Sequence, residues 1–188
     1  MKVGMGVRFR THAKVNLFLR VLGARADGFH EVETILQGID LHDEFEVVPD
    51  DGSLSVAMKF ATGRAGRLPE LQQNLVYRAG ERLLAHHGGR VGADIRVVKG
   101  IPIGAGLGGG SSNAAGTLVV LSELWGIDLE RADLLRIAGE LGSDVPYCID
   151  GGIALATERG QKITPRPTPD IEMCLVLGGM NYALSSRA

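Results

Sequence analysis

Hydrophobic and polar residues alternate over the first sixty residues of the chain in the way that β-strands require. Residues 5–22 contain two such runs, and residues 31–40 repeat the alternation less regularly. Residues 43–60 carry the pattern on both sides of a Pro-Asp-Asp-Gly turn at 49–52. A turn is also expected at 23–28. The first third of the chain is therefore predicted to be antiparallel β-structure.

The rest of the chain alternates between helical and strand patterns. Residues 71–87 place apolar side chains at helical spacing, and Gly88 and Gly89 are expected to end this helix. Two more helices are predicted at 114–125 and 129–141. The strands predicted after residue 70 are 93–99, a strand pair within 147–160, and 172–177. Together these elements predict an α+β fold.

The composition is that of an ordinary globular chain except for glycine, which supplies 27 of 188 residues. That share is about twice the usual one. The 20 basic and 22 acidic residues leave a net charge of −2, so no overall field draws the protein to nucleic acid or to an anionic membrane. Cys148 and Cys174 form no CxxC pair, and no apolar run suits a signal peptide or a membrane span. These features predict a cytoplasmic protein that binds neither nucleic acid nor a membrane.

Glycine is concentrated between the strand predicted at 93–99 and the helix predicted at 114–125. Six of the 27 glycines lie in the eleven residues 100–110. Because glycine has no Cβ, its backbone N–H groups can line a concavity, and a helix N-terminus directly behind adds further donors. A glycine-rich hinge or packing turn is the simpler reading. The position before a helix favours a phosphate-binding loop.

Three other kinds of anion-binding loop fit this segment less well. A Walker A loop contains a lysine, and no lysine lies between Lys99 and Lys162. The dinucleotide fingerprint matches at Gly104, Gly106 and Gly109, but it requires a strand after the helix, where this chain has a second helix. A protein-kinase glycine loop needs HRD and DFG partners, which the sequence lacks.

The segment 102–115, PIGAGLGGGSSNAA, resembles the phosphate loop of the GHMP small-molecule kinases. Two further blocks, 13–34 and 141–149, match this family in the same order, and the resemblance extends from about 13 to 177. The blocks are most similar to the branch that acts on 4-diphosphocytidyl-2-C-methyl-D-erythritol. The resemblance implies a fold like domain 2 of ribosomal protein S5, with a mixed or antiparallel sheet and helices on one side. It also implies an ATP- and Mg²⁺-dependent kinase for the 2-hydroxyl of that compound, in the non-mevalonate isoprenoid pathway.

The resemblance assigns roles to individual residues. It implies that Asp144 is the general base for the acceptor hydroxyl, although an aspartate at this place could equally end a helix or turn. Lys14 interrupts an apolar strand, so it must be paired or face a polar cavity; the resemblance pairs it with Asp144. Asn74 is expected near the adenine, or as an N-cap, and Ser112 or Ser111 beside the metal. The residues expected to bind ATP are Pro102, Gly104, Gly106, Leu107, Gly108, Gly109, Gly110, Ser111, Ser112, Asn113 and Asn74.

The resemblance also indicates residues that contact the substrate. Phe29 and His30 are expected to recognise the cytosine, and Asn16 shares a strand face with Lys14 and is expected to contact substrate. Many family members have tyrosine where this chain has Phe29; stacking survives that change and a hydroxyl hydrogen bond does not. The other histidines show no metal-ligand spacing and are expected to have surface or capping roles: His12, His42, His86 and His87.

Family members carry a second, C-terminal domain that helps to close the substrate cleft. Residues 1–177 are expected to form the N-terminal ATP-binding and catalytic domain, and 178–188 a divergent tail where the second domain would begin. The chain would then be a fragment or a naturally short form that binds nucleotide weakly and turns over slowly or not at all. The alternatives are an inactive nucleotide-binding module and another GHMP kinase, for mevalonate, homoserine or a sugar. The oligomeric state stays open, a homodimer included.

Overall fold

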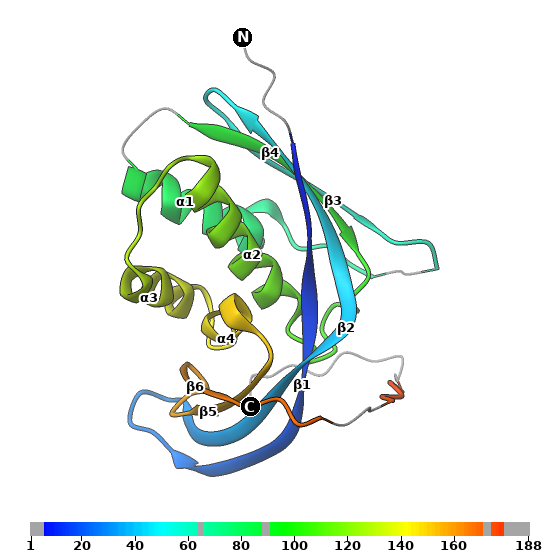
Figure 1. Cartoon of the computed structure of the whole chain (residues 1–188), viewed down its shortest axis with the longest axis vertical. Helices are drawn as coiled ribbons and strands as arrows, with labels where there is room; N and C mark the ends of the chain where they lie inside the picture. Colours follow the sequence, from blue (N-terminus) through cyan, green and yellow to red (C-terminus); the bar gives the residue numbers. More distant parts are fainter. Residues whose placement is uncertain (1–5, 64–65, 88–90, 171–173, 179–188) are drawn as a thin grey trace.

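The computed structural model describes residues 6–63, 66–87, 91–170 and 174–178. They form a six-stranded sheet with helices packed on one face, so the predicted α+β class is confirmed (Figure 1). Among the described residues, no helix has both the length and the apolarity needed to cross a membrane. The elements are β1 (Val7–Ala24), β2 (His30–Asp50), β3 (Leu54–Phe60), the 3-10 turn η1 (Leu71–Gln73), α1 (Leu75–His87), β4 (Gly92–Lys99), α2 (Gly109–Leu124), α3 (Arg131–Leu141), α4 (Val145–Asp150), β5 (Ile153–Thr157) and β6 (Lys162–Arg166).

The strands β1 and β2 form a long antiparallel hairpin that runs the length of the molecule (Figure 1). The segments 31–40 and 43–60 were predicted as separate strand regions, but residues 30–50 form one strand. The irregular alternation there is a bulge: His12 pairs with His42 and Ala13 pairs with Ile39, which leaves two residues of β2 without a partner on β1. A bulge interrupts the period-two pattern without ending the strand.

The prediction that the first third is entirely antiparallel is wrong for β3. The sheet order is β3-β4-β2-β5-β6, with β1 also paired to β2, so β4 lies between β2 and β3. β3 pairs with β4 in parallel, and α1 makes the crossover. Alternation marks a strand but does not identify its partner. The turn that connects β2 to β3 is held by Asp50, which accepts hydrogen bonds from the amides of Gly52 and Ser53. A turn of this kind does not make the two strands neighbours in the sheet.

Several helical segments differ from the predictions, among them α3, which begins at Arg131 rather than 129. α1 begins at Leu75 rather than 71, after the short turn η1. α2 begins at Gly109, five residues before the predicted start at 114, because tertiary packing outweighs the low helix propensity of glycine. Residues 147–150 belong to α4 and not to a strand, since short apolar runs fit either element, and β5 and β6 form the pair instead.

Part of the last predicted strand is also wrong. Residues 174–177 form no strand, and 172–173 lie outside the described residues. The glycines at 88–89 that were expected to end α1, and the tail 179–188, likewise lie outside them.

The core lies between the helices and the apolar face of the sheet. Phe45 and Val47 of β2 and Ile95 of β4 are buried, whereas their neighbours Glu46 and Arg96 face the opposite, charged side. The alternation in the sequence therefore encodes one face for the helices and one for solvent. The helical residues buried in this core include Val76, Ala79, Leu83, Ala114, Ala115, Leu118, Leu121, Trp125, Ile137, Ala138 and Leu141.

Candidate active site

The glycine loop joins β4 to α2 and adopts a backbone that suits glycine. Gly104, Gly106 and Gly108 have φ angles of 72°, 71° and 69°, in the left-handed region that other residues rarely adopt. Gly108 directly precedes α2, which is sixteen residues long. The free N–H groups of the first turn of this helix therefore open onto the loop, which makes the segment suitable for binding phosphate.

A pocket of about 320 Å³ lies beside the glycine loop. Its other walls are formed by Met58 and Pro69, by residues 73–76 at the start of α1, and by Lys99. Of the residues predicted to bind ATP, only Ser112 does not line it; the others are Pro102, Gly104, Gly106, Leu107, Gly108, Gly109, Gly110, Ser111, Asn113 and Asn74. Apolar walls next to a polar loop fit a ligand with a flat base and a phosphate chain.

Asn74 takes the N-cap role, one of the two that were predicted for it, and also lines the glycine-loop pocket. Its Oδ1 accepts a hydrogen bond of 3.0 Å from the amide of Val76, so the side chain caps α1. It is 5% exposed and also lines the pocket. Its Nδ2 contacts Met58 Sδ at 3.4 Å.

Lys14 and Asp144 form an ion pair on the other side of the glycine loop. Lys14 Nζ lies 3.2 Å from Asp144 Oδ2 and donates to Asn16 Oδ1 at 2.9 Å. The Lys14 side chain is 8% exposed and the Asp144 side chain 35%. Asn16 in turn donates to Thr34 Oγ1 at 2.8 Å, which fixes its amide. The expected contact between Lys14 and Asp144 is therefore present, and Asn16 belongs to the same group.

Direct backbone contact joins this ion pair to the glycine loop. The amide of Lys14 donates to the carbonyl of Leu107 at 2.9 Å. Gly108 packs on the Lys14 side chain so closely that a Cβ at this position would lie 2.8 Å from Lys14 Cγ. The loop and the ion pair are thus held at a defined separation, although they belong to different segments of the chain.

Asp144 occupies the N-cap position of α4 but does not act as a cap. Its side chain makes no capping hydrogen bond, and it points to Lys14 instead. Pro146 in the first turn of α4 needs no amide partner, which lowers the demand for a cap. The carboxylate is thus left to Lys14 and to any group that enters from solvent.

Sequence reasoning missed a second lysine–aspartate pair beside the loop. Lys99 Nζ donates to Asp43 Oδ2, and both side chains are buried, with exposures of 5% and 0%. Asp43 Oδ1 also accepts hydrogen bonds from the amides of Gly100 at 2.7 Å and Ile101 at 2.8 Å. Two ionisable residues next to apolar strands were the available signal, since a buried charge needs a partner. This pair anchors the beginning of the glycine loop.

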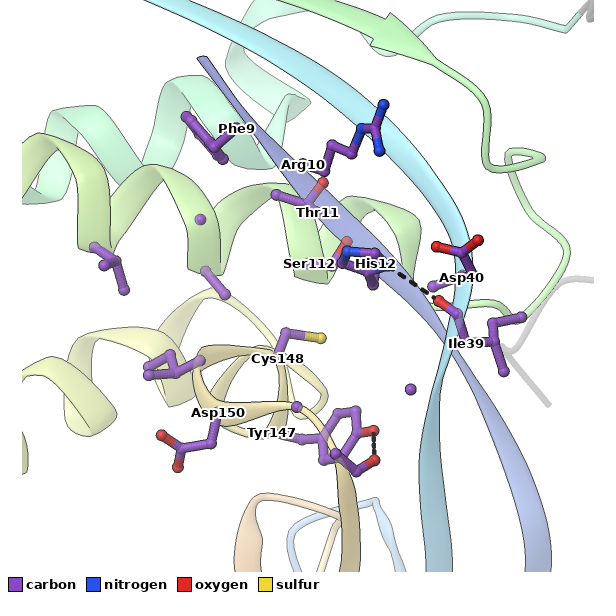
Figure 2. Close-up of a pocket in the computed structure, with 18 of the residues that line it drawn as sticks. Phe9, Arg10, Thr11, His12, Ile39, Asp40, Ser112, Tyr147, Cys148 and Asp150 are labelled. Atoms are coloured by element: carbon purple, nitrogen blue, oxygen red, sulfur yellow. Dashed lines mark hydrogen bonds between the residues drawn. The ribbon is translucent and has the colours of Figure 1, made fainter. Parts of the chain in front are cut away.

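Ser112 is turned away from the glycine-loop pocket. It is 4% exposed, and its hydroxyl donates to the carbonyl of Gly109 at 3.3 Å. It lines a second pocket, of about 590 Å³, between β1, α2 and α4 (Figure 2). Ser111, the other candidate for the metal, lines the glycine-loop pocket. Of the two serines predicted beside the metal, only Ser111 therefore lines the glycine-loop pocket.

Cys148 lines the second pocket (Figure 2). Burial, together with the negative charge of Asp144, raises the pKa of its thiol to about 12, and the positive charge of Lys14 opposes this shift. The thiol is therefore protonated at neutral pH and a poor nucleophile.

Phe29 and His30 lie at the far end of the β1–β2 hairpin. His30 pairs with Ala24, ten residues along β1 from Lys14. The Phe29 ring is half exposed, and the guanidinium of Arg159 lies 4.6 Å from its centroid. Both predicted residues are thus accessible, but the described residues do not bring them into contact with the Lys14–Asp144 pair.

Comparison with known proteins finds a matching family model and relatives of similar sequence. Residues 74–152 match the family model described as the GHMP kinases N terminal domain. The chain is 48% identical over 166 residues to the 4-diphosphocytidyl-2-C-methyl-D-erythritol kinase of Pelotomaculum thermopropionicum, covering 87% of this chain and 56% of that protein. The kinase of the same name from a Nostoc species is 43% identical over 173 residues, covering 88% of this chain and 52% of that protein.

A solved structure agrees with these sequence matches. The crystal structure of a 4-(cytidine 5'-diphospho)-2C-methyl-D-erythritol kinase superimposes with a TM-score of 0.71 at 36% identity, covering 87% of this chain and 56% of that one. The chain therefore spans a little over half the length of the relatives that it matches.

Proposed function

We propose that the chain belongs to the GHMP kinase superfamily and carries the ATP-binding and phosphoryl-transfer site of a kinase for 4-diphosphocytidyl-2-C-methyl-D-erythritol. The reaction is phosphorylation of the 2-hydroxyl, a step in the supply of isoprenoid precursors, and we place it in the cytoplasm. One observation carries the proposal: the amide of Lys14 is bonded to Leu107 of the glycine loop while the Lys14 side chain pairs with Asp144. A phosphate-binding loop and a candidate base thus meet.

In this proposal the nucleotide occupies the glycine-loop pocket. The base lies between Asn74 and the apolar wall that includes Met58, and the phosphates follow the loop to the first turn of α2. The N–H groups of the loop and of the helix N-terminus would stabilise the charge that develops on the transferred phosphoryl group.

Asp144 is proposed to receive the proton of the acceptor hydroxyl. The hydroxyl oxygen attacks the γ-phosphorus, the bond from this phosphorus to the bridging oxygen breaks, ADP leaves, and the hydroxyl proton passes to the carboxylate. Lys14 keeps the carboxylate oriented through the ion pair. Asn16 holds the other side of the Lys14 ammonium, so this group cannot swing away.

A magnesium ion would be held largely by the nucleotide. The two aspartates nearest the loop, Asp43 and Asp144, are both paired with lysine, which leaves a serine hydroxyl as the protein oxygen available at the start of α2. Ser111, which lines the pocket, would supply that oxygen, and phosphates and water would complete the shell that Mg²⁺ prefers. When bound, the ion would neutralise phosphate charge.

The cytidine part of the substrate is proposed to reach the β1–β2 hairpin. Phe29 offers a half-exposed ring for stacking and His30 lies next to it. Arg159 already covers one face of the Phe29 ring, so a base would stack on the other face or displace the guanidinium.

The test is a coupled ADP-release assay of the purified chain with three acceptors: the cytidyl substrate, mevalonate and homoserine. We expect ADP release that depends on the cytidyl substrate, at a low rate if the second half of the relatives' length is needed to close the site. Equal rates with homoserine or mevalonate would contradict the assigned substrate. ATP binding without acceptor-dependent release would favour the nucleotide-binding module.

A further inference from the structure

Two histidines and an aspartate outside the candidate active site come together at the bulge in the β1–β2 hairpin. His12 of β1 and His42 of β2 are direct cross-strand partners, with ring centroids 5.6 Å apart. One ligand atom from each of His12, Asp40 and His42 lies within 4.8 Å of the other two. The three residues are 28 and 2 positions apart in the sequence, so only the hairpin register brings them together.

The bulge explains why Asp40 is available to this cluster. A regular antiparallel ladder that continued from the His12–His42 pair would place Lys14 opposite Asp40. The register shift instead places Lys14 opposite Gly38, and Asp40 has no partner on β1. Asp40 and His42, two residues apart on β2, keep neighbouring side chains, with 3.9 Å between Asp40 Oδ1 and His42 Nδ1. The bulge therefore separates the carboxylate from the lysine and leaves it beside two imidazoles.

Backbone carbonyls orient both imidazole rings. His42 Nδ1 lies 2.6 Å from the carbonyl oxygen of Asp40, and His12 Nδ1 lies 3.3 Å from that of Ile39, as Figure 2 shows for His12. In the neutral ring Nδ1–H can donate to such a carbonyl, and Nε2 then keeps its lone pair. A backbone carbonyl on the second ring nitrogen is a usual feature of histidines that bind metals.

The cluster is accessible to ions from solvent. His12 and Asp40 are exposed, and the His42 side chain is 24% exposed. The Asp40 side chain is 98% exposed, so it loses little by turning toward an ion. The charged residues next along the ladder are paired, Asp43 with Lys99 and Arg10 with Glu44, so each pair balances its own charge. The net charge that an incoming cation meets at the cluster is therefore the carboxylate of Asp40.

We propose that His12, Asp40 and His42 form a surface site for a divalent transition-metal ion such as Zn²⁺. Two imidazoles and one carboxylate are a ligand set that suits Zn²⁺, Ni²⁺ or Cu²⁺, with water completing the shell, and not Mg²⁺, which prefers oxygen ligands. The site is thus chemically distinct from the nucleotide-bound magnesium of the proposed kinase reaction.

An ion at this site would strengthen the support of the glycine loop. His12 is two residues from Lys14, and His42 directly precedes Asp43, which holds Lys99. The carbonyl of His42 also packs on Gly100, where a Cβ would come within 2.3 Å of the carbonyl oxygen. Cross-linking the two strands at the bulge would therefore resist opening of the hairpin beside both lysine–aspartate pairs.

The experiment is a calorimetric titration of Zn²⁺ into the tag-free, chelator-treated chain without nucleotide. We expect about one ion per chain, with affinity lowered by about tenfold or more in His12→Gln and in His42→Gln, and by less in Asp40→Asn. His86→Gln, which changes an exposed histidine on α1, should bind as the unaltered chain does. Cys148→Ser and Cys174→Ser should also leave binding unchanged, and Mg²⁺ should give no comparable heat.

Thermal unfolding gives a second readout that does not depend on the binding heat. Zn²⁺ should raise the melting temperature of the unaltered chain and of His86→Gln, but not that of His12→Gln, whose melting temperature without metal reports whether the variant is folded. Binding that persists in both histidine variants, or that is lost only in a cysteine variant, overturns the proposal. So does the absence of Zn²⁺ binding by the unaltered chain.

Discussion

Two lysine–aspartate pairs flank the glycine loop, and they differ in how completely their carboxylates are occupied. Asp43 has no exposed surface, and its oxygens accept from Lys99 and from the amides of Gly100 and Ile101. Asp144 is about one-third exposed and is paired with Lys14 through Oδ2. Within the described part of the chain, Asp144 Oδ1 receives no hydrogen bond.

This difference separates a structural pair from one that is suited to chemistry. A fully buried carboxylate that already accepts three hydrogen bonds is closed to a ligand hydroxyl, but removing it leaves a buried charge behind. A carboxylate with one open oxygen, held beside a phosphate-binding loop, can accept a substrate hydroxyl. The two lysine–aspartate pairs are therefore expected to respond differently to mutation. Changing Asp144 should mainly lower activity, and changing Asp43 should mainly lower stability.

The largest expected effect on activity is that of Asp144→Asn. Losing the general base should lower the rate of phosphoryl transfer by about 10²- to 10⁴-fold, while the affinity for ATP changes little because Asp144 does not line the glycine-loop pocket. ADP release and a separate nucleotide-binding measurement check the two parts. The matched control is Asp150→Asn at the other end of α4, where the aspartate pairs with Arg131. Equal losses in the two variants would contradict the role of Asp144.

Asp43→Asn should act mainly on stability. The asparagine oxygen can still accept from the loop amides, but Lys99 is left without a counter-charge in a buried site, which costs about 3–5 kcal/mol. Urea denaturation measures the loss. The double variant Asp43→Asn/Lys99→Met removes the orphaned charge and should recover part of the stability. A double variant as unstable as the single one would show that the ion pair is not what holds this segment.

Gly108→Ala tests how closely the loop must approach the Lys14–Asp144 pair. The left-handed backbone costs alanine about 1–2 kcal/mol, and the new methyl would also meet Lys14 Cγ at 2.8 Å. Gly126→Ala is the control, since its φ is 64° and nothing lies within 4 Å of a Cβ there. We expect similar backbone costs by denaturation, with activity lowered by about tenfold or more only in Gly108→Ala. Equal activities would mean that the contact with Lys14 does not matter.

The smallest expected effect is on the reactivity of Cys148. Its thiol has a raised pKa of about 12, so the thiolate is scarce at pH 8 and iodoacetamide should label it far more slowly than the exposed Cys174. Since the negative charge of Asp144 contributes to the raised pKa, Asp144→Asn should lower the pKa of Cys148 and speed its labelling. Mass spectrometry of the labelled peptides measures both rates. Asp43→Asn, tested under conditions in which this variant is folded, should leave the ratio of the Cys148 labelling rate to the Cys174 labelling rate unchanged. An equal increase of this ratio in Asp43→Asn would refute the assignment of the raised pKa in part to the charge of Asp144.

Much of the site could be predicted from residues and motifs, because the glycine loop is local. A loop with a left-handed backbone requires glycine at those positions. The loop and its place before a helix can therefore be identified from the sequence. The contact between Lys14 and Asp144 was expected from family resemblance and is present. The Lys99–Asp43 pair was missed, since nothing near either residue indicates that the other lies beside it.

The sequence by itself determined most of the strands and helices, the apolar face of the sheet and the phosphate-type loop, because each of these depends on neighbours a few residues away. The tertiary structure decided which strand lies beside β3, where the hairpin register shifts, and therefore which side chains meet across it. Register is chosen by burying the combined apolar surface of strands and helices that lie far apart in the chain. For that reason His12 and His42 had no visible connection in the sequence, and two similar lysine–aspartate pairs acquired different environments.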